Sequence, residues 1–176
     1  MAQRTEAEKY FPDPFGLPDL PPFDDLISWW QGLVRTHGRP TRHHIQFRDL
    51  QGWHSRLTIS EALPDRSDLL VRLVGEDVAD LFEGHLAPGA RLSQVMGISP
   101  NNQRLHVGHL IEQGCLALTS GKIRLSNGAA IAARALDFPL TNEDGPNQVL
   151  TFYDFTLPLI FKNIPRQTTG LREPVT

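Results

Sequence analysis

The sequence has little of several features that mark particular classes of protein. It contains one cysteine, Cys115, among 176 residues, so no disulfide can form within the chain, which fits a reducing compartment. No apolar run approaches the roughly 20 residues that a membrane-spanning helix needs, and the first residues lack the apolar core of a secretory signal. The formal net charge is −3, without the basic excess that nucleic-acid binding usually requires. We therefore expect a cytoplasmic protein with no membrane span and no nucleic-acid partner.

Short catalytic motifs are also absent. The chain contains no Gly-x-Ser-x-Gly, no His-Glu-x-x-His, no P-loop and no Gly-x-Gly-x-x-Gly, which excludes the enzyme classes that depend on them. A fold can assemble a hydrolytic triad from distant residues, but nothing in the sequence favours one. The sequence predicts that the chain is not an enzyme.

The composition that is present is typical of one globular domain, with 40% hydrophobic and 21% charged residues. Residues 1–22 carry charges and then five prolines, and proline fixes φ and removes a hydrogen-bond donor. We expect an extended, poorly packed proline-rich arm over 1–22, a domain over 23–156, and a loose tail over 157–176.

The segment that follows this arm has the strongest helical pattern. Asp24 can cap a helix, and Gly38 with Pro40 ends the pattern. The apolar face of this helix is wider than the stripe of about 100° usual for a surface helix. Its members are Leu26, Ile27, Trp29, Trp30, Leu33 and Val34.

The remaining elements alternate between strands and helices in groups. We expect strands at 57–60, 69–74, 122–126, 129–140 and 148–155, a short helix between Gly75 and Gly84, and a longer helix at about 102–120. Asn127-Gly128 indicates a hairpin with a type I′ turn. Grouped strands with inserted helices predict an α+β fold, a five-stranded antiparallel sheet with helices on one face.

The last expected strand is apolar on both of its faces. Val149, Tyr153 and Phe155 fall on one side, and Leu150 and Phe152 on the other. One layer of helices covers only one face of a sheet, so we expect the N-terminal helix to cover the outer face. We expect its excess apolar surface, Trp29, Trp30 and Leu33, to form a homodimer interface. The alternative is a monomer whose helix only covers its own sheet.

This order of elements resembles a PAS domain. In detail, the sequence resembles a bacterial PAS subfamily that often occurs without an attached output domain. The segments that carry the resemblance are Trp30, Arg39-Pro40-Thr41-Arg42, Arg72-Leu73-Val74-Gly75, Leu81-Phe82-Glu83-Gly84-His85-Leu86 and Leu136-Asp137-Phe138-Pro139-Leu140. The sequence departs from the family at His43-His44, where the family tends to have an acidic residue.

The resemblance implies a pocket between the sheet and its helices. We expect Phe82, Leu110, Ile111 and Phe138 to line it and to bind a small apolar or amphipathic ligand. The function implied is a stand-alone sensory or protein-interaction module that signals in trans to a partner protein. Two alternatives remain: a small enzyme that uses the same pocket, which a buried titratable pair would support, and a structural dimerisation protein with a filled core.

Several residues bear on cofactors and ligands. The helical wheel places His106 and His109 opposite the apolar face of the 102–120 helix, as solvated residues, and Cys115 reads as a small buried hydrophobe. We therefore expect no haem, flavin or metal cofactor. Arg72 and Arg134 interrupt apolar strands; either their side chains reach solvent, or one of them anchors an anionic ligand group in the pocket.

Overall fold

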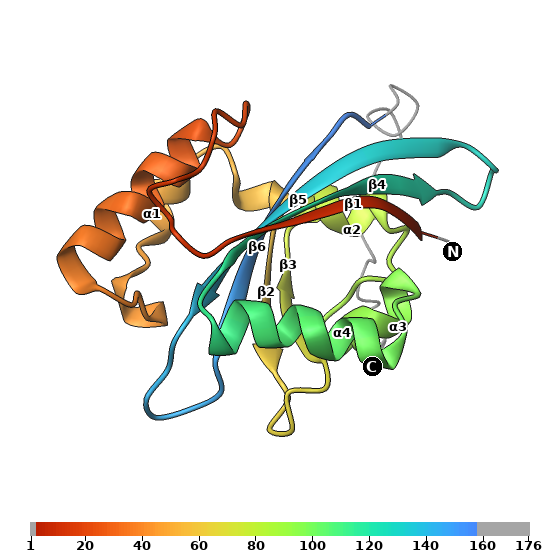
Figure 1. Cartoon of the computed structure of the whole chain (residues 1–176). Helices are drawn as coiled ribbons and strands as arrows, with labels where there is room; N and C mark the ends of the chain where they lie inside the picture. The colour runs from red at the N-terminus through yellow and green to blue at the C-terminus, as the bar shows by residue number, and fades with distance from the viewer. Residues whose placement is uncertain (1–2, 158–176) are drawn as a thin grey trace, which may run out of the picture.

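The computed structural model describes residues 3–157 as one six-stranded antiparallel sheet with helices on both faces (Figure 1). The strand order across the sheet is β1-β4-β5-β6-β2-β3. The strands are β1 (Gln3–Phe11), β2 (Leu57–Ala62), β3 (Leu69–Val74), β4 (Leu116–Arg124), β5 (Ala130–Leu140) and β6 (Gln148–Phe155). The expected order of helix, two strands, helices and three strands is confirmed, with one further strand at the N-terminal end, and the fold is α+β.

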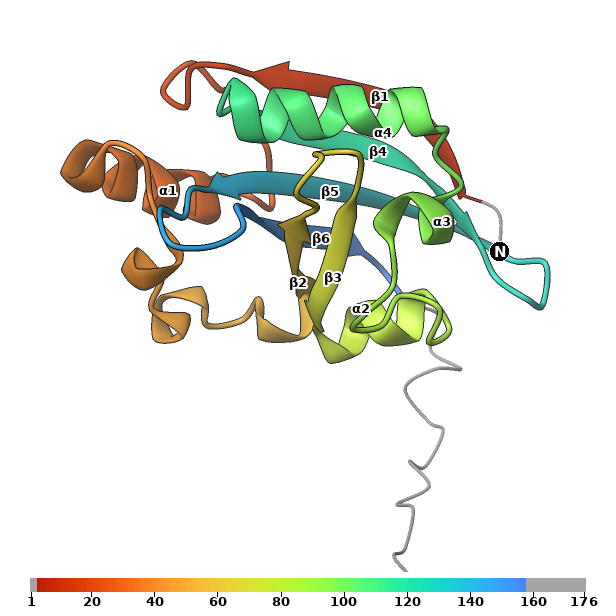
Figure 2. The same ribbon diagram turned by 90° about the horizontal axis from the view of Figure 1, so that it is seen from below.

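The helices form two groups on opposite faces of the sheet (Figure 1). They are α1 (Asp24–His37), α2 (Glu76–Leu81), α3 (Leu92–Met96) and α4 (Pro100–Val107), and α4 continues into a π-helical turn, η4 (Gly108–Glu112). Short 3₁₀ turns at Arg42–His44, Phe47–Leu50 and His54–Arg56 connect α1 to β2. Figure 2 shows α2 and α3 following the β2–β3 hairpin.

Helix α1 covers the face that the sequence predicted for it. Trp30 is 2% exposed, and its ring centroid lies 5.0 Å from that of Phe138 on β5. Trp29 packs edge to face against two rings of the sheet. Its ring centroid lies 6.2 Å from that of Phe138 and 6.4 Å from that of Phe152 on β6. Asp24 does not cap the helix by itself, since the N-cap position is Phe23 and the Asp24 carboxylate accepts a hydrogen bond from a preceding backbone amide.

The N-terminal arm expected over 1–22 contains a strand instead. β1 pairs antiparallel with β4, and Gln3 to Phe11 align with Ile123 to Leu116. Leu17 and Leu20, in the proline-rich part, pack against the α1 core. The expectation was wrong because an edge strand is held by backbone hydrogen bonds, which an alternation of charged residues does not prevent. The tail from residue 158 onward lies outside the described residues.

The long helix expected over 102–120 is also shorter in the structure. The helical turns end at Glu112, Gly114 adopts φ +68°, and β4 begins at Leu116. A glycine in the left-handed region ends a helix readily. Leu118, which the periodicity assigned to the helix, therefore belongs to β4.

The hairpin between β4 and β5 is confirmed, but its turn differs from the one expected. Within this turn, Gly128 has positive φ and Asn127 does not. The amide of Gly128 donates to the carbonyl of Leu125, and the amide of Leu125 donates to the carbonyl of Ala129. This pattern fits a three-residue loop with glycine in the left-handed position.

Within the described residues, no helix is both long and apolar enough to cross a bilayer.

Candidate functional site

A cleft of about 580 Å³ lies between the sheet and the segment that runs from α3 to η4. We call it the inner cleft. It is bounded by β1, the middle strands β4, β5 and β6, and residues 92–109. Because side chains alternate along a strand, every second residue of β5 faces this cleft, Ala135 and Asp137 among them, while their neighbours face α1. The cleft therefore lies on the opposite side of the sheet from α1.

A buried ion-paired histidine lines the inner cleft. His106 of α4 is 8% exposed. Its Nε2 lies 3.2 Å from Oδ2 of Asp137 on β5, and its Nδ1 lies 2.7 Å from Oε1 of Glu8 on β1. The hydroxyl of Tyr10 lies 2.8 Å from the same Nδ1, and Thr151 donates to the other oxygen of Asp137 at 2.5 Å. The cluster joins β1, α4, β5 and β6.

The surroundings decide the charge of this cluster. Burial alone would lower the pKa of His106, but the hydrogen bonds to Asp137 and Glu8 outweigh it and raise that pKa to about 9. The hydrogen bond from His106 lowers the pKa of Glu8, against the effect of its partial burial. Burial and the adjacent Glu8 carboxylate raise the pKa of Tyr10 well above its ordinary range. At neutral pH the cluster is therefore an imidazolium between two carboxylates, with a neutral tyrosine hydroxyl.

A second buried network holds α4 in place. The carboxylate of Asp68, at the entrance to β3, accepts hydrogen bonds from the Ser93 hydroxyl at 2.5 Å and from the Gln103 amide at 2.9 Å. Gln103 is fully buried and precedes His106 by one helical turn. Asp68 thereby fixes the helix that carries His106.

The structure does not bring the four expected pocket residues together. Phe82 is buried edge-on to Tyr153, at 6.0 Å between centroids, on the inner side of the sheet. Phe138 is buried against Trp30 on the outer side, because its neighbour in the strand faces the inner cleft. Phe82 and Phe138 therefore do not share a pocket.

Leu110 and Ile111 do line a pocket, but a different one. It has a volume of about 220 Å³ and lies between the end of α1 and η4, with Trp30 and Val34 in its wall.

The three residues expected at the dimer interface differ in how exposed they are. Trp30 is buried against its own sheet, whereas Trp29 and Leu33 are half-buried.

The placement of His106 at the surface was wrong, because β1 covers the side of α4 that the helical wheel left open. Asp137 was the available signal, since a carboxylate in an otherwise apolar strand requires a buried partner.

The other residues considered for cofactors are placed as follows in the fold. His109 is half-buried, and its ring stacks on Tyr10 at 4.1 Å. Among the described residues no group of three or more His, Cys, Asp and Glu side chains could hold a metal ion. Burial raises the pKa of the Cys115 thiol, as suits the buried residue that was expected.

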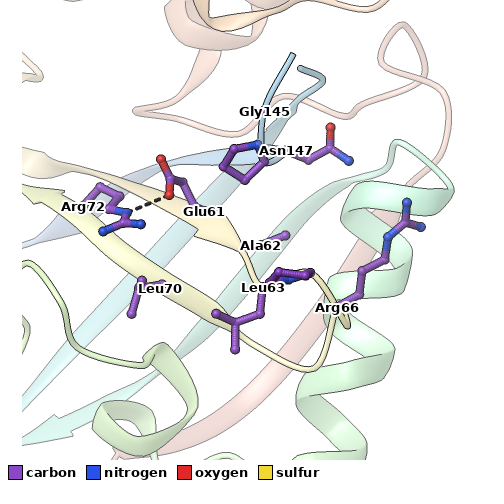
Figure 3. A pocket seen from close by; sticks show the side chains of 10 residues that line it. Glu61, Ala62, Leu63, Arg66, Leu70, Arg72, Gly145 and Asn147 are labelled. Carbon is purple, nitrogen blue, oxygen red and sulfur yellow. Dashed lines mark hydrogen bonds and ion pairs between the residues drawn. The ribbon is translucent and has the colours of Figure 1, made fainter. Parts of the chain in front are cut away.

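Neither arginine reaches the inner cleft. Arg72 Nε lies 2.7 Å from Glu61 Oε2, in a surface pocket of about 490 Å³ beside the β2–β3 hairpin (Figure 3). Arg134 lies 2.6 Å from Asp154 and donates to the carbonyl of Pro21. Their side chains are 52% and 35% exposed, so the first alternative, contact with solvent, describes them. An anionic anchor in the inner cleft is excluded for both.

Comparison with known proteins adds one structural similarity. No protein-family model matches the chain, and no curated protein matches its sequence. Among solved structures, the chain is similar to one described as "Structure of an RNA-binding Light-Oxygen-Voltage Receptor". The two share 14% identity with a TM-score of 0.44, over 87% of this chain and 39% of that chain. The chain thus spans about two fifths of the receptor's length.

Proposed function

We propose that the chain is a sensory module that binds a small apolar or amphipathic molecule in the inner cleft and signals to a partner protein in trans. The observation that carries this proposal is a cleft of about 580 Å³ with a buried charged cluster in its wall. Ligand sites are usually concavities of about 300–1,000 Å³ with few, well-placed polar groups. A structural protein with a filled core has no need of such a space.

The position of β1 supports a signalling role. β1 is an edge strand, so it is hydrogen-bonded on one side only, and it supplies Glu8 and Tyr10 to the inner cleft. A ligand that contacts these two side chains would interact differently with attached and displaced forms of β1. Such a difference in affinity is what shifts a conformational population. A partner protein that recognises the edge of the sheet would then read the change.

A small enzyme is the second candidate, and the His106–Asp137 pair favours it as the buried titratable pair that such an enzyme would use. We rank it below the sensor because a general base acts best with a pKa near the operating pH. A His106 pKa of about 9 leaves the imidazole protonated at pH 7, and both of its nitrogens already contact carboxylates. A measured His106 pKa near 7 in the purified protein would favour the enzyme.

The remaining proposals concern the setting of the module. We propose a cytoplasmic homodimer in which Trp29 and Leu33 of α1 contribute to the interface, since Trp30 is occupied within its own protomer. We propose no nucleic-acid partner for this chain, because its net charge is −3.

Native mass spectrometry of the gently purified protein tests ligand binding. Ala135 faces the inner cleft, so Ala135→Trp should fill it. Ala132, on the same strand, is exposed and outside the cleft, so Ala132→Trp is the matched control. We expect retained small molecules in the wild type and in Ala132→Trp, and none in Ala135→Trp. Equal retention by all three proteins would place the ligand elsewhere and contradict the proposal.

A further inference from the structure

The inner cleft is unusual in the balance of its charges. Two carboxylates line it, Glu8 and Asp137, together with the single imidazolium of His106. No lysine or arginine is among the described residues that line it. The charges of Glu8, Asp137 and His106 sum to −1 when His106 is protonated, and a second histidine of the cleft, His109, is stacked on Tyr10. An anionic ligand would meet two carboxylates, and the imidazolium of His106 is already paired with both of them.

The same cluster has more hydrogen-bond acceptors than donors. Each carboxylate offers about four acceptor positions. The protein fills some of them with the two N–H groups of His106, the hydroxyl of Tyr10 and the hydroxyl of Thr151. A ligand that brings further donors completes this arrangement, whereas a ligand that brings acceptors competes within it.

The two carboxylates differ in how easily a ligand reaches them. The Asp137 side chain is 10% exposed, with one oxygen on His106 and the other on Thr151. The Glu8 side chain is 39% exposed, because it stands on the edge strand. Glu8 is thus the carboxylate that a ligand entering from solvent meets first.

One part of the cleft wall is apolar. Leu92, Met96 and Ile98, from α3 and the loop after it, form part of the wall opposite the sheet. Leu105 also lines the cleft and is 64% exposed, a large exposed fraction for a leucine. An aliphatic chain in the cleft would cover this surface and remove it from water.

From these observations we propose that the inner cleft selects amphipathic amines, with a primary ammonium group on Glu8 and an aliphatic chain along the α3 wall, over carboxylates and phosphates of the same size. The proposal rests on the proposed function, since it names the ligand class for the same site. An ammonium group supplies three donors and a positive charge, which match the excess of acceptors and the net negative charge of the cluster.

Three probes with the same chain and different head groups test the selection: octylammonium, 1-octanol and octanoate, titrated calorimetrically at pH 7. We expect octylammonium to bind about tenfold more tightly than octanoate, with octanol between them. Octanoate binding as tightly as octylammonium would overturn the proposal, and so would the failure of all three to bind at millimolar concentration.

Two substitutions locate the effect. Glu8→Gln keeps the shape of the side chain and removes its charge, so we expect it to abolish most of the preference for the amine and to leave octanol binding within about twofold. Glu143→Gln removes the same charge from an exposed loop outside the cleft and should change neither. If Glu8→Gln, checked for its fold by circular dichroism, keeps the full preference, the proposal is wrong.

The Ala135→Trp variant separates the failure of this proposal from that of the proposed function. If it abolishes binding of every probe while octanoate is the preferred one in the wild type, the cleft is a ligand site of the opposite charge selectivity. If it leaves amine binding unchanged, the amine binds elsewhere, and both the site and the selectivity are wrong.

Discussion

The ion-paired His106 predicts a definite dependence of stability on pH. Its pKa is about 9 in the folded protein, against 6.5 for the isolated side chain. The folded state therefore binds this proton more tightly than the unfolded state does. The contribution to the free energy of unfolding is full below about pH 6.5 and is lost as the pH rises through 9. At about 1.4 kcal/mol for each unit of pKa, the total is about 3 kcal/mol.

Urea unfolding between pH 6 and pH 10 measures this contribution when the wild type is compared with His106→Gln. Glutamine can donate to one carboxylate but carries no charge. At pH 6 we expect the variant to be less stable by about 3–5 kcal/mol, the usual effect of removing one partner of a buried ion pair. The difference should shrink by about 3 kcal/mol towards pH 10, because the wild type loses its proton there.

Four other titratable groups lie around His106. They are Glu8 and Tyr10 on β1, Asp137 on β5, and His109 on η4. All four are present in both proteins. The variant removes the interaction with His106 that lowers the pKa of Glu8, but a carboxylate titrates below the pH 6–10 range of the comparison. Parallel pH curves for the two proteins would refute the reasoning. A proton NMR titration that places the His106 pKa near 6.5 would refute it independently.

Three further predictions concern packing, assembly and colour. A Cβ on Gly75 would meet backbone atoms at 2.6 Å, whereas one on Gly32, in the exposed middle of α1, would meet nothing within 4 Å. We expect Gly75→Ala to lower the free energy of unfolding by about 1–3 kcal/mol and Gly32→Ala to raise it by about 0.5–1 kcal/mol. Equal effects of the two substitutions would contradict this account. Sedimentation at micromolar concentration should show a dimer that Trp29→Ser weakens, while Trp30→Ser mainly destabilises the fold; a monomeric wild type would exclude the interface. The purified protein should show no Soret or flavin absorbance, because carboxylates already contact both nitrogens of His106, and such a band would contradict this prediction.

The sequence predicted the elements whose signals are local. The range of α1 follows from one apolar face that ends at Gly38, and the β4–β5 hairpin follows from Asn127-Gly128. The order of these elements was enough to indicate an α+β fold with an antiparallel sheet. In each case the residues that decide the structure lie within a few positions of one another.

The elements that the sequence did not predict depend on residues far apart in the chain. The pairing of β1 is decided by the free edge of β4, and nothing within residues 3–11 indicates that partner. The burial of His106 depends on Asp137 and Glu8, which reach it from two other strands. Phe138 was assigned to the wrong side of the sheet. The sequence alone does not say which residues of β5 face the cleft, and a shift of one residue reverses which side chains face inward.

The pairing of β1 with β4 also sets an order on the assembly of the protein during synthesis. The residues of β1 leave the ribosome well before their partners, which lie more than a hundred residues further along the chain, from Leu116 to Ile123. Until that segment has emerged, β1 has no edge to join, and closing so long a loop is slow. Asp137 lies further along still, so the nascent chain carries Glu8 unpaired until nearly the whole domain has been made. The wall of the cleft that a ligand meets first is therefore held by contacts that cannot form until late in synthesis.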